Sequence, residues 1–596
     1  MSNFDAWDYA VLITILIISA MIGIYYRLSG GKQRTTKEYL MADQSMSALP
    51  VSFSLMASFM SAVTLLGVSN ESYVYGCMFA VINISYVIST PIAAYLFLPV
   101  FYRMRTTSVY EYLERRFGHS MRMAASVAYS IQMILYMGIV LYAPALALEA
   151  VTGISKVAAI LAIGVVCTFY STVGGMKAVL ITDVFQSILM FAAIYAVIIV
   201  SAIKAGGLKE IWSVAAENER LNFDDFSVDP TVRHTWWSLI IGGMVTYLSL
   251  YGVNQTQVQR LLSVKDLKSA QTALWWNLPI LCCLSFSTLF SGLALYYYYL
   301  KCDPLLGGRI KSRDQLMPLF AVDTMGEYPG LCGLFVSGIF SASLSTVSSS
   351  VSSLSAVTLE DYLKPLYKKI FNKTMTDSST TLPSKIIACI YGVVCIALAF
   401  SVGSMGSGVL QASLTIFGVV GGPLLAVFTL GVGTTKANQR GVLIGLLLGL
   451  MFSFWIGFGG PKPPPKPLPL ANEGCNSTLV APSLSLMQEM FNETLAATTP
   501  VNSPAEQEYF WLYRLSYLWF SVLGFIITLT VGYASSWLLE HFQLADNSQI
   551  YLDTSLKQID YDLFAPPLSR RLRERDANDE LSKLNYCENT MVMVLG

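Results

Sequence analysis

The chain has 596 residues, its 38 basic and 38 acidic residues cancel to a formal net charge of zero, and 54% of its residues are hydrophobic while only 13% are charged. Ordinary soluble domains contain about 25% charged residues, so this composition argues against a string of soluble domains, and the balanced charge gives no sign of nucleic-acid binding. Apolar stretches of about 20 residues recur instead along nearly the whole chain, and each could cross a hydrocarbon core of about 30 Å. In the bilayer every backbone polar group must bond within the protein, which only helices and closed barrels allow. Barrel strands need only about 10 residues of alternating polarity, whereas these stretches are longer and apolar on every face. The sequence therefore predicts an all-α polytopic membrane protein.

Thirteen stretches are long enough to be membrane-spanning helices. The first follows a short acidic segment and is long enough to span, so we expect it to remain as a helix rather than to be removed as a signal peptide. In chain order the expected spans are 8–27, 50–74, 78–102, 121–148, 154–172, 180–203, 236–256, 273–300, 328–357, 384–404, 408–432, 440–459 and 511–538.

The second and ninth spans contain far more hydroxyl groups than a lipid-facing helix needs. Ser52, Ser54, Ser58 and Ser61 lie in the second span, and nine of the thirteen residues in 341–353 are serine or threonine. Close helix packing is one interpretation, since small residues and hydroxyls are common at transmembrane interfaces. The other is a site for a hard monovalent cation, which neutral oxygens and the free carbonyls of a broken helix can bind.

The sixth span begins with a carboxylate, Asp183. Intramembrane carboxylates are candidates for function, although a structural ion pair with Lys177 would explain this one equally well. In the seventh span the adjacent Gly242 and Gly243 indicate a bend or a close approach between helices. Five spans separate the start of the second span from that of the seventh, which is the pattern of two inverted five-helix repeats with broken first helices.

The charges of the loops predict the orientation. Basic residues follow the first, third, fifth, seventh, ninth and eleventh spans, which puts these loops in the cytoplasm and the N-terminus outside. The loop 460–510 then lies outside, and it contains a Pro-rich run at 461–469 and two glycosylation sequons, at Asn476 and Asn492. A third sequon, at Asn372, lies inside and should stay unmodified. Cys302 and Cys475 both fall outside and could pair in an oxidising compartment.

The sequence contains no constellation of catalytic residues. The nucleophile elbow GxSxG, the zinc motif HExxH and the nucleotide-binding motif GxxxxGK[ST] are absent, and no His/Cys cluster has metal-ligand spacing. We therefore expect no enzyme activity and no cofactor, and transport would have to be driven by an ion gradient.

Several motifs in order resemble the sodium:solute symporter family over about residues 5–540, and the branch that contains sodium-coupled monocarboxylate, iodide and multivitamin transporters in particular. They are Ser58-Phe-Met-Ser-Ala-Val-Thr64, Thr107-Ser-Val-Tyr-Glu-Tyr-Leu-Glu114, Leu141-Tyr-Ala-Pro-Ala-Leu-Ala-Leu148, Gly174-Gly-Met-Lys-Ala-Val179, Tyr251-Gly-Val-Asn-Gln255 and Leu344-Ser-Thr346.

This resemblance implies a LeuT-type fold, with sodium bound between the second and ninth spans. The sodium ligands that it implies are the carbonyls of Ala57, Met60 and Ala342 and the hydroxyls of Ser345 and Thr346. The substrate residues that it implies are Phe59, Thr64, Tyr86, Tyr136, Tyr247, Leu410 and Leu414. Tyr86 departs from the pattern of the iodide carriers.

The resemblance also narrows the substrate. Iodide carriers have glutamine where this chain has Thr64, monocarboxylate carriers have threonine, and the polar residues of the sugar carriers are replaced by Phe59 and Thr64. We therefore expect a sodium-coupled symporter of small organic anions in the plasma membrane, such as lactate, pyruvate or nicotinate, working by alternating access. A vitamin carrier for biotin or pantothenate and an iodide carrier are the neighbouring alternatives. A transport-incompetent sensor or a channel on the same scaffold is the alternative from another class.

The expected organisation follows from these spans and from the resemblance. Residues 1–49 hold the extracellular N-terminus, the first helix and the first cytoplasmic loop, and 50–203 form the first repeat. An extracellular loop, 204–235, leads to the second repeat at 236–432. The last two helices occupy 433–540, together with the outer loop 460–510, and the cytoplasmic tail is 541–596.

Overall fold

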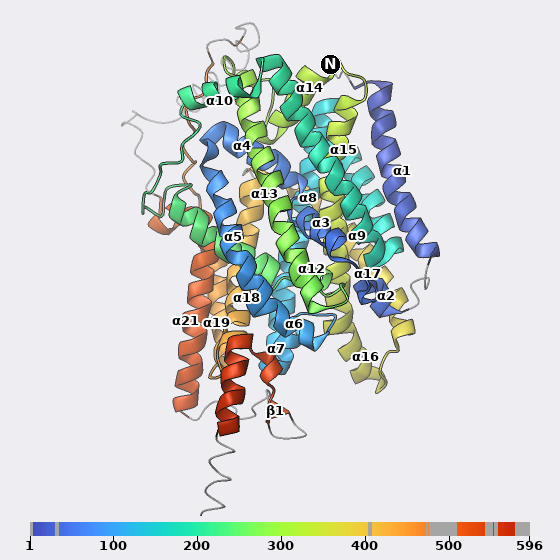
Figure 1. Cartoon of the computed structure of the whole chain (residues 1–596), viewed down its shortest axis with the longest axis vertical. Helices are drawn as coiled ribbons and strands as arrows, with labels where there is room; N and C mark the ends of the chain where they lie inside the picture. The colour runs from blue at the N-terminus through green and yellow to red at the C-terminus, as the bar shows by residue number, and fades with distance from the viewer. Residues whose placement is uncertain are drawn as a thin grey trace, which may run out of the picture.

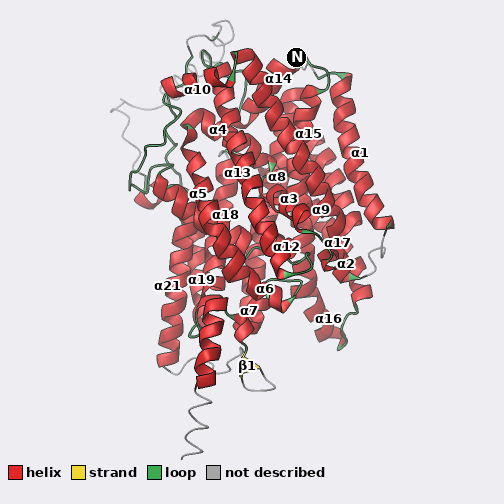
Figure 2. Cartoon of the chain, viewed as in Figure 1, coloured by secondary structure: helices red, strands yellow, loops and turns green. Residues whose placement is uncertain are grey.

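The computed structural model describes residues 4–29, 35–402, 408–472, 475, 509–542, 552–553 and 558–578. Within these residues the chain is a bundle of long helices (Figures 1 and 2). The strands of the described residues are limited to one antiparallel pair of two residues each, β1 (Leu552–Asp553) and β2 (Gln558–Ile559). The all-α prediction is therefore confirmed.

The helices follow one another in this order: α1 Ala6–Leu28, α2 Thr36–Met41, α3 Ala48–Phe59, α4 Ala62–Tyr75, α5 Ile82–Ile92, α6 Leu98–Met104, α7 Glu111–Arg116, α8 His119–Thr152, α9 Lys156–Ala205, α10 Leu208–Glu217, α11 Gly243–Tyr247, α12 Gln255–Leu261, α13 Leu267–Tyr298, α14 Leu316–Met325, α15 Leu331–Val357, α16 Lys364–Phe371, α17 Asp377–Val402, α18 Val409–Gly433, α19 Gln439–Phe458 and α21 Trp519–His541.

Ten helices of the described part are long and apolar enough to cross a membrane, or eleven if the bent pair α3–α4 counts as one span. The sequence predicts thirteen, and two elements account for the difference. The predicted spans 154–172 and 180–203 are joined in α9, where Gly175 has a φ of 63° that only glycine adopts without strain. The predicted span 236–256 corresponds to the shorter apolar helix Ser238–Gly252. The number thirteen therefore stays a prediction.

Large apolar side chains are exposed along the outside of the bundle, as a lipid environment requires. Ile13 and Met21 of α1 are 53% and 58% exposed, and Met451 of α19 is 67% exposed. Such a surface would be an aggregation hazard in water but matches lipid tails. The hydroxyl-rich α15 lies at the opposite extreme, since nearly all of its residues are buried against neighbours that include α9, α8 and α1.

Two helices are broken near the middle of the bundle. The first break lies between α3 and α4, which meet at 62°. The second interrupts the segment 238–261 at Val253 and Asn254, where Asn254 has an extended backbone and caps α12. The glycine pair does not make this bend, since it lies ten residues earlier. Gly243 serves close packing instead, because a Cβ there would meet the Ser85 hydroxyl at 2.5 Å.

The loops gather at two opposite ends of the bundle, which we name after the predicted orientation. The N-terminus, α10 and α14 lie at one end, which we call the outer face, and α2, α7 and α16 lie at the other, which we call the inner face (Figure 1). At the outer face Cys302 and Cys475 form a disulfide with their Cα atoms 5.0 Å apart. The sequons at Asn476 and Asn492 lie outside the described residues.

Part of the C-terminal tail packs against the inner face. Leu563 and Phe564 are buried there, the Tyr112 hydroxyl donates to the carbonyl of Leu563, and the backbone N–H of Ala565 donates to the carbonyl of Val432 at the end of α18. The sequence predicts a polar tail and does not indicate this contact.

Candidate sodium and substrate sites

The break between α3 and α4 frees backbone carbonyls in the centre of the bundle. In a continuous helix the N–H of Ser61 would donate to the carbonyl of Ala57, but here it donates to the carbonyl of Phe59 at 3.1 Å. The last regular bond of α3 runs from the N–H of Met60 to Met56 at 2.8 Å. The carbonyl of Ala57 therefore has no partner within its own helix, and such an oxygen can bind a cation or a hydroxyl group.

The hydroxyl of Thr346 in α15 meets this carbonyl. Its Oγ1 lies 3.5 Å from the oxygen of Ala57 and 3.0 Å from the oxygen of Ala342. Three of the five expected sodium ligands are thus gathered at one point. Ser345 differs from these three ligands, because its hydroxyl donates to the carboxylate of Asp183 in the neighbouring helix α9 at 2.6 Å.

Asp183 is the centre of a buried polar cluster rather than a residue of the membrane surface. Its carboxylate accepts hydrogen bonds from Ser345 and Ser54 and lies 3.4 Å from the guanidinium of Arg260 in α12. Both charged side chains are fully buried. The ion pair with Lys177 that the sequence suggests is therefore wrong, and Arg260 is the partner.

Arg260 connects four helices through this cluster. It donates to the hydroxyls of Ser54 in α3, at 2.7 Å, and of Ser349 in α15, and it also bonds to the carbonyl of Thr256 within α12, at 2.8 Å. With Asp183 of α9, these contacts join the four helices on the inner side of the helix break. The sequence analysis missed this role, and the one available signal was the place of Arg260 next to a predicted span.

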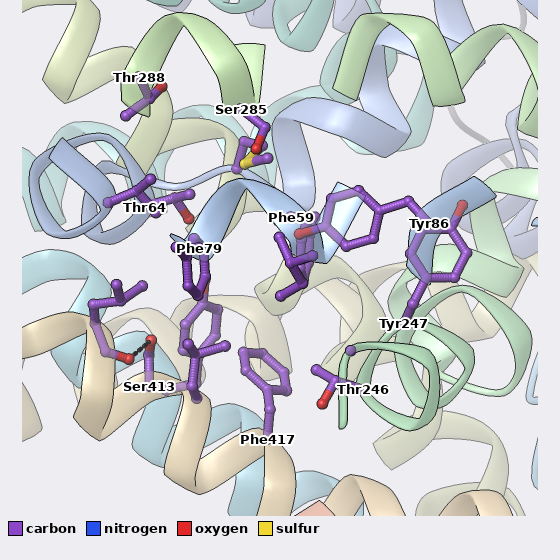
Figure 3. A pocket seen from close by; sticks show the side chains of 17 residues that line it. Phe59, Thr64, Phe79, Tyr86, Thr246, Tyr247, Ser285, Thr288, Ser413 and Phe417 are labelled. Atoms are coloured by element: carbon purple, nitrogen blue, oxygen red, sulfur yellow. Dashed lines mark hydrogen bonds between the residues drawn. The ribbon is translucent and has the colours of Figure 1, made fainter. Parts of the chain in front are cut away.

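A small cavity lies beside the break and is lined by all seven expected substrate residues (Figure 3). The lining comes from α3, α4, α5, α8, α11, α13 and α18, together with the turn before α5. Ten further residues that were not among the expected substrate residues also line the cavity: Met60, Val68, Phe79, Ile82, Gly243, Thr246, Ser285, Thr288, Ser413 and Phe417.

The cavity is apolar and aromatic, with hydroxyl groups but no charged side chain among its described lining residues. Tyr136 donates to the hydroxyl of Ser61 in the helix break at 3.2 Å, and Tyr247 bonds to Thr90 at 2.8 Å. The Thr64 hydroxyl has no hydrogen-bond partner within the described part of the chain, so it is available to a ligand. About 40 Å³ is open to the centre of a water molecule, which is room for a few waters.

Comparisons with known proteins agree with this geometry. The model of the sodium:solute symporter family matches residues 39–449. A putative sodium-dependent multivitamin transporter of Drosophila melanogaster is 60% identical over 575 residues, which is 96% of this chain and 93% of the relative. Sodium-coupled monocarboxylate transporter 1 of Homo sapiens is 45% identical over 536 residues, which is 89% of this chain and 87% of the relative.

A solved structure shows the same fold. It is described as the substrate-bound outward-open state of a Na+-coupled sialic acid symporter, and it matches with a TM-score of 0.73 over 90% of this chain and 98% of that chain. At 22% sequence identity the likeness concerns the fold alone.

Proposed function

Because this chain belongs to the sodium:solute symporter family and is therefore a sodium-coupled solute symporter rather than an enzyme, we propose that its solute is a small organic carboxylate. Monocarboxylates such as lactate, pyruvate and nicotinate are the proposed substrates, carried across the plasma membrane by alternating access. Sodium would bind at the carbonyls of Ala57, Met60 and Ala342 and the hydroxyls of Ser345 and Thr346. The solute would bind in the cavity beside them.

The observation that carries this proposal is an uncharged cavity next to freed carbonyl oxygens. An anion in such a cavity has no fixed cation to balance its charge. The sodium ion bound at Ala57 and Thr346 would supply that charge, helped by the positive N-terminal end of α4 at Ala62. Each ligand then lowers the electrostatic cost of binding the other, and this coupling must be equal in both directions.

A second candidate is a carboxylate vitamin such as biotin or pantothenate. The 60% identity to the putative multivitamin transporter favours it, whereas the threonine at position 64 favours short monocarboxylates. Both kinds of solute present a carboxylate to the same apolar cavity, so the electrostatic mechanism is common to them. They differ in the volume that the cavity must open to.

Uptake of labelled lactate, biotin and iodide, measured side by side in cells without a related carrier, tests the proposal. We expect saturable, sodium-dependent uptake of a carboxylate. Equilibrium binding to the purified protein should show that sodium lowers the Kd of the carboxylate by the same factor as the carboxylate lowers the Kd of sodium. Thr64→Gln should shift preference toward iodide, and Thr64→Ser, which keeps the hydroxyl, is its control. Preference for a neutral sugar would refute the substrate class, and a sodium current without solute uptake would indicate a channel.

A further inference from the structure

A second, much larger cavity opens at the outer face. Space for the centres of water molecules in it amounts to about 1060 Å³. Its floor includes Leu410 of α18, which also lines the small cavity. Leu410 packs against Gly67 of α4 so closely that a Cβ on this glycine would meet the Cβ of Leu410 at 2.5 Å. Leu410 thus lies between the outer cavity, which we call the vestibule, and the uncharged cavity below, and it lines both.

The vestibule, unlike the cavity below it, is strongly charged. Six basic side chains and three acidic ones line it, and the carboxylates of Asp303 and Asp323 lie directly behind two of the basic groups, so one positive charge is left in excess. The basic residues are Lys156, Arg233, Arg309, Lys311, Arg313 and Lys462, and the acidic residues are Glu71, Glu149 and Asp314.

Two of the six cations have no carboxylate partner in the described part of the chain. Lys311 is exposed and forms no ion pair there. Lys462 donates to the carbonyl of Gly457 at 2.7 Å and lies over the ring of Phe520. Burial lowers the pKa of Lys462 to about 8, so it still carries its charge at neutral pH.

The other four cations are held in place by acids, and two of these acids lie behind the wall. Arg309 pairs with Asp323 at 2.7 Å and Arg313 pairs with Asp303, and neither aspartate lines the vestibule. Arg233 pairs with Glu71 and also donates to Gln411 at 3.0 Å. The side chains are thus fixed by partners on one side while their charge faces the cavity.

The rim of the vestibule is fixed by the Pro-rich strap, residues 461–471. Its Leu468 N–H donates to Val74 at the end of α4, and its Ala471 carbonyl accepts from Asp303. Arg220 binds it as well, through the carbonyl of Pro469. Prolines and these bonds restrict the strap, and Lys462 near its start is held by its bond to the carbonyl of Gly457.

We propose that the vestibule is a first binding site for the carboxylate group of the transported solute. The solute occupies this site without sodium, before it passes Leu410. This inference rests on the proposed function. A partly enclosed cavity in which one sign of charge predominates focuses the electric field and raises the local concentration of ions of the opposite sign. The described lining of the cavity below Leu410 contains no basic side chain, so the anion leaves the basic side chains of the vestibule only where sodium can replace them. The vestibule thus selects for charge, and the cavity selects for shape.

The test uses the full-length protein in cells, with surface expression measured for every variant. Lys311→Glu changes the local charge by two units at an exposed position. We expect it to raise the KM for the carboxylate about three- to tenfold, to leave the maximal rate unchanged, and to weaken the dependence of KM on ionic strength. Lys301→Glu makes the same change at an exposed residue of the outer face that does not line the vestibule, and it should alter none of these values.

A second measurement keeps one residue and varies only its charge. Lys311→Cys is treated from outside with a thiol reagent that adds a positive group or with one that adds a negative group. The positive adduct should restore the KM of the parent protein and the negative adduct should raise it further, whereas Lys301→Cys should respond to neither. Equal KM values for both adducts would overturn the vestibule site and would leave the proposed function standing, provided that the parent protein transports carboxylates. Absence of sodium-driven carboxylate uptake by the parent would instead refute the proposed function, and the ligand of the vestibule with it.

Discussion

Replacement of Asp183 by asparagine should destabilise the protein more than replacement of both Asp183 and Arg260. The carboxylate of Asp183 lies 3.4 Å from the guanidinium of Arg260, and both side chains are fully buried. Asparagine is nearly isosteric and can still accept from Ser345. The single change therefore removes the negative charge and leaves the positive charge of Arg260 buried without an anion.

The size of the effect follows from what remains around Arg260. Removal of one member of a buried ion pair costs about 3–5 kcal/mol of folding free energy. Arg260 keeps its bonds to Ser54, Ser349 and the carbonyl of Thr256, so we expect about 3 kcal/mol, the lower end. The double variant Asp183→Asn/Arg260→Met has no buried charge left at this cluster, and we expect it to recover about 2 kcal/mol of that loss.

Unfolding of the purified protein in one detergent, followed by the fluorescence of its ten tryptophans, would measure the ranking. The parent should melt highest, the double variant next and Asp183→Asn lowest. Glu111→Gln is the control, since it breaks an exposed pair with Arg115 and should cost no more than about 0.5 kcal/mol. Arg260→Met alone completes the comparison. Additive effects of Asp183→Asn and Arg260→Met, or an unaltered melting temperature for Asp183→Asn, would show that the pair does not carry this energy.

Three further predictions concern the sodium site, the orientation and the tail. Thr346→Ala should raise the sodium concentration for half-maximal transport about tenfold, because a ligand oxygen is lost. Thr346→Ser keeps the oxygen and is the control. Ser345→Ala should have a smaller effect, because the hydroxyl of Ser345 bonds to Asp183. Sodium activation unchanged in Thr346→Ala would exclude the site. A glycosidase should shift the mass of the parent protein but not of a variant without Asn476 and Asn492, and a shift that depends on Asn372 would reverse the assignment of inside and outside. Phe564→Ala should speed amide hydrogen exchange in residues 561–577, since Phe564 is buried against the inner face, while Phe542→Ala, at a side chain that is 65% exposed, should not; equal exchange in both variants would mean that the tail is not held by this ring.

The environment of Asp183 shows where sequence reasoning could have gone further. Lys177 and Asp183 are six residues apart, which is about 600° along a helix, so their side chains point to different sides. Helical geometry alone disfavours that pair. The true partner, Arg260, lies 77 residues further along the chain, and nothing in the local pattern of α9 indicates it.

The bend in the segment 238–261 shows a different limit of sequence reasoning. The sequence offers Gly242 and Gly243 as the flexible point, but the helix breaks at Val253 and Asn254. Gly243 is needed for close contact with Ser85 of α5. A glycine permits both a bend and a close approach, and only the neighbouring helix decides between them.

The sequence by itself determined which segments are helical and which two spans face a polar centre. An apolar stretch in lipid must satisfy its own backbone hydrogen bonds, so its length and composition suffice to predict a helix. The hydroxyl groups of the second and ninth spans indicated a polar environment for a similar reason, since hydroxyls in lipid need partners. That these two spans meet was implied by the resemblance to the family.

Tertiary structure alone decided which of these groups meet. It directed Ser345 to Asp183 and Thr346 to the carbonyl of Ala57, although the two hydroxyls are adjacent in the sequence. It also gathered the basic residues of distant loops around one vestibule. The physical reason is that contacts between helices depend on how far each helix rotates and how it packs against partners distant in the chain, and local periodicity contains no information about either.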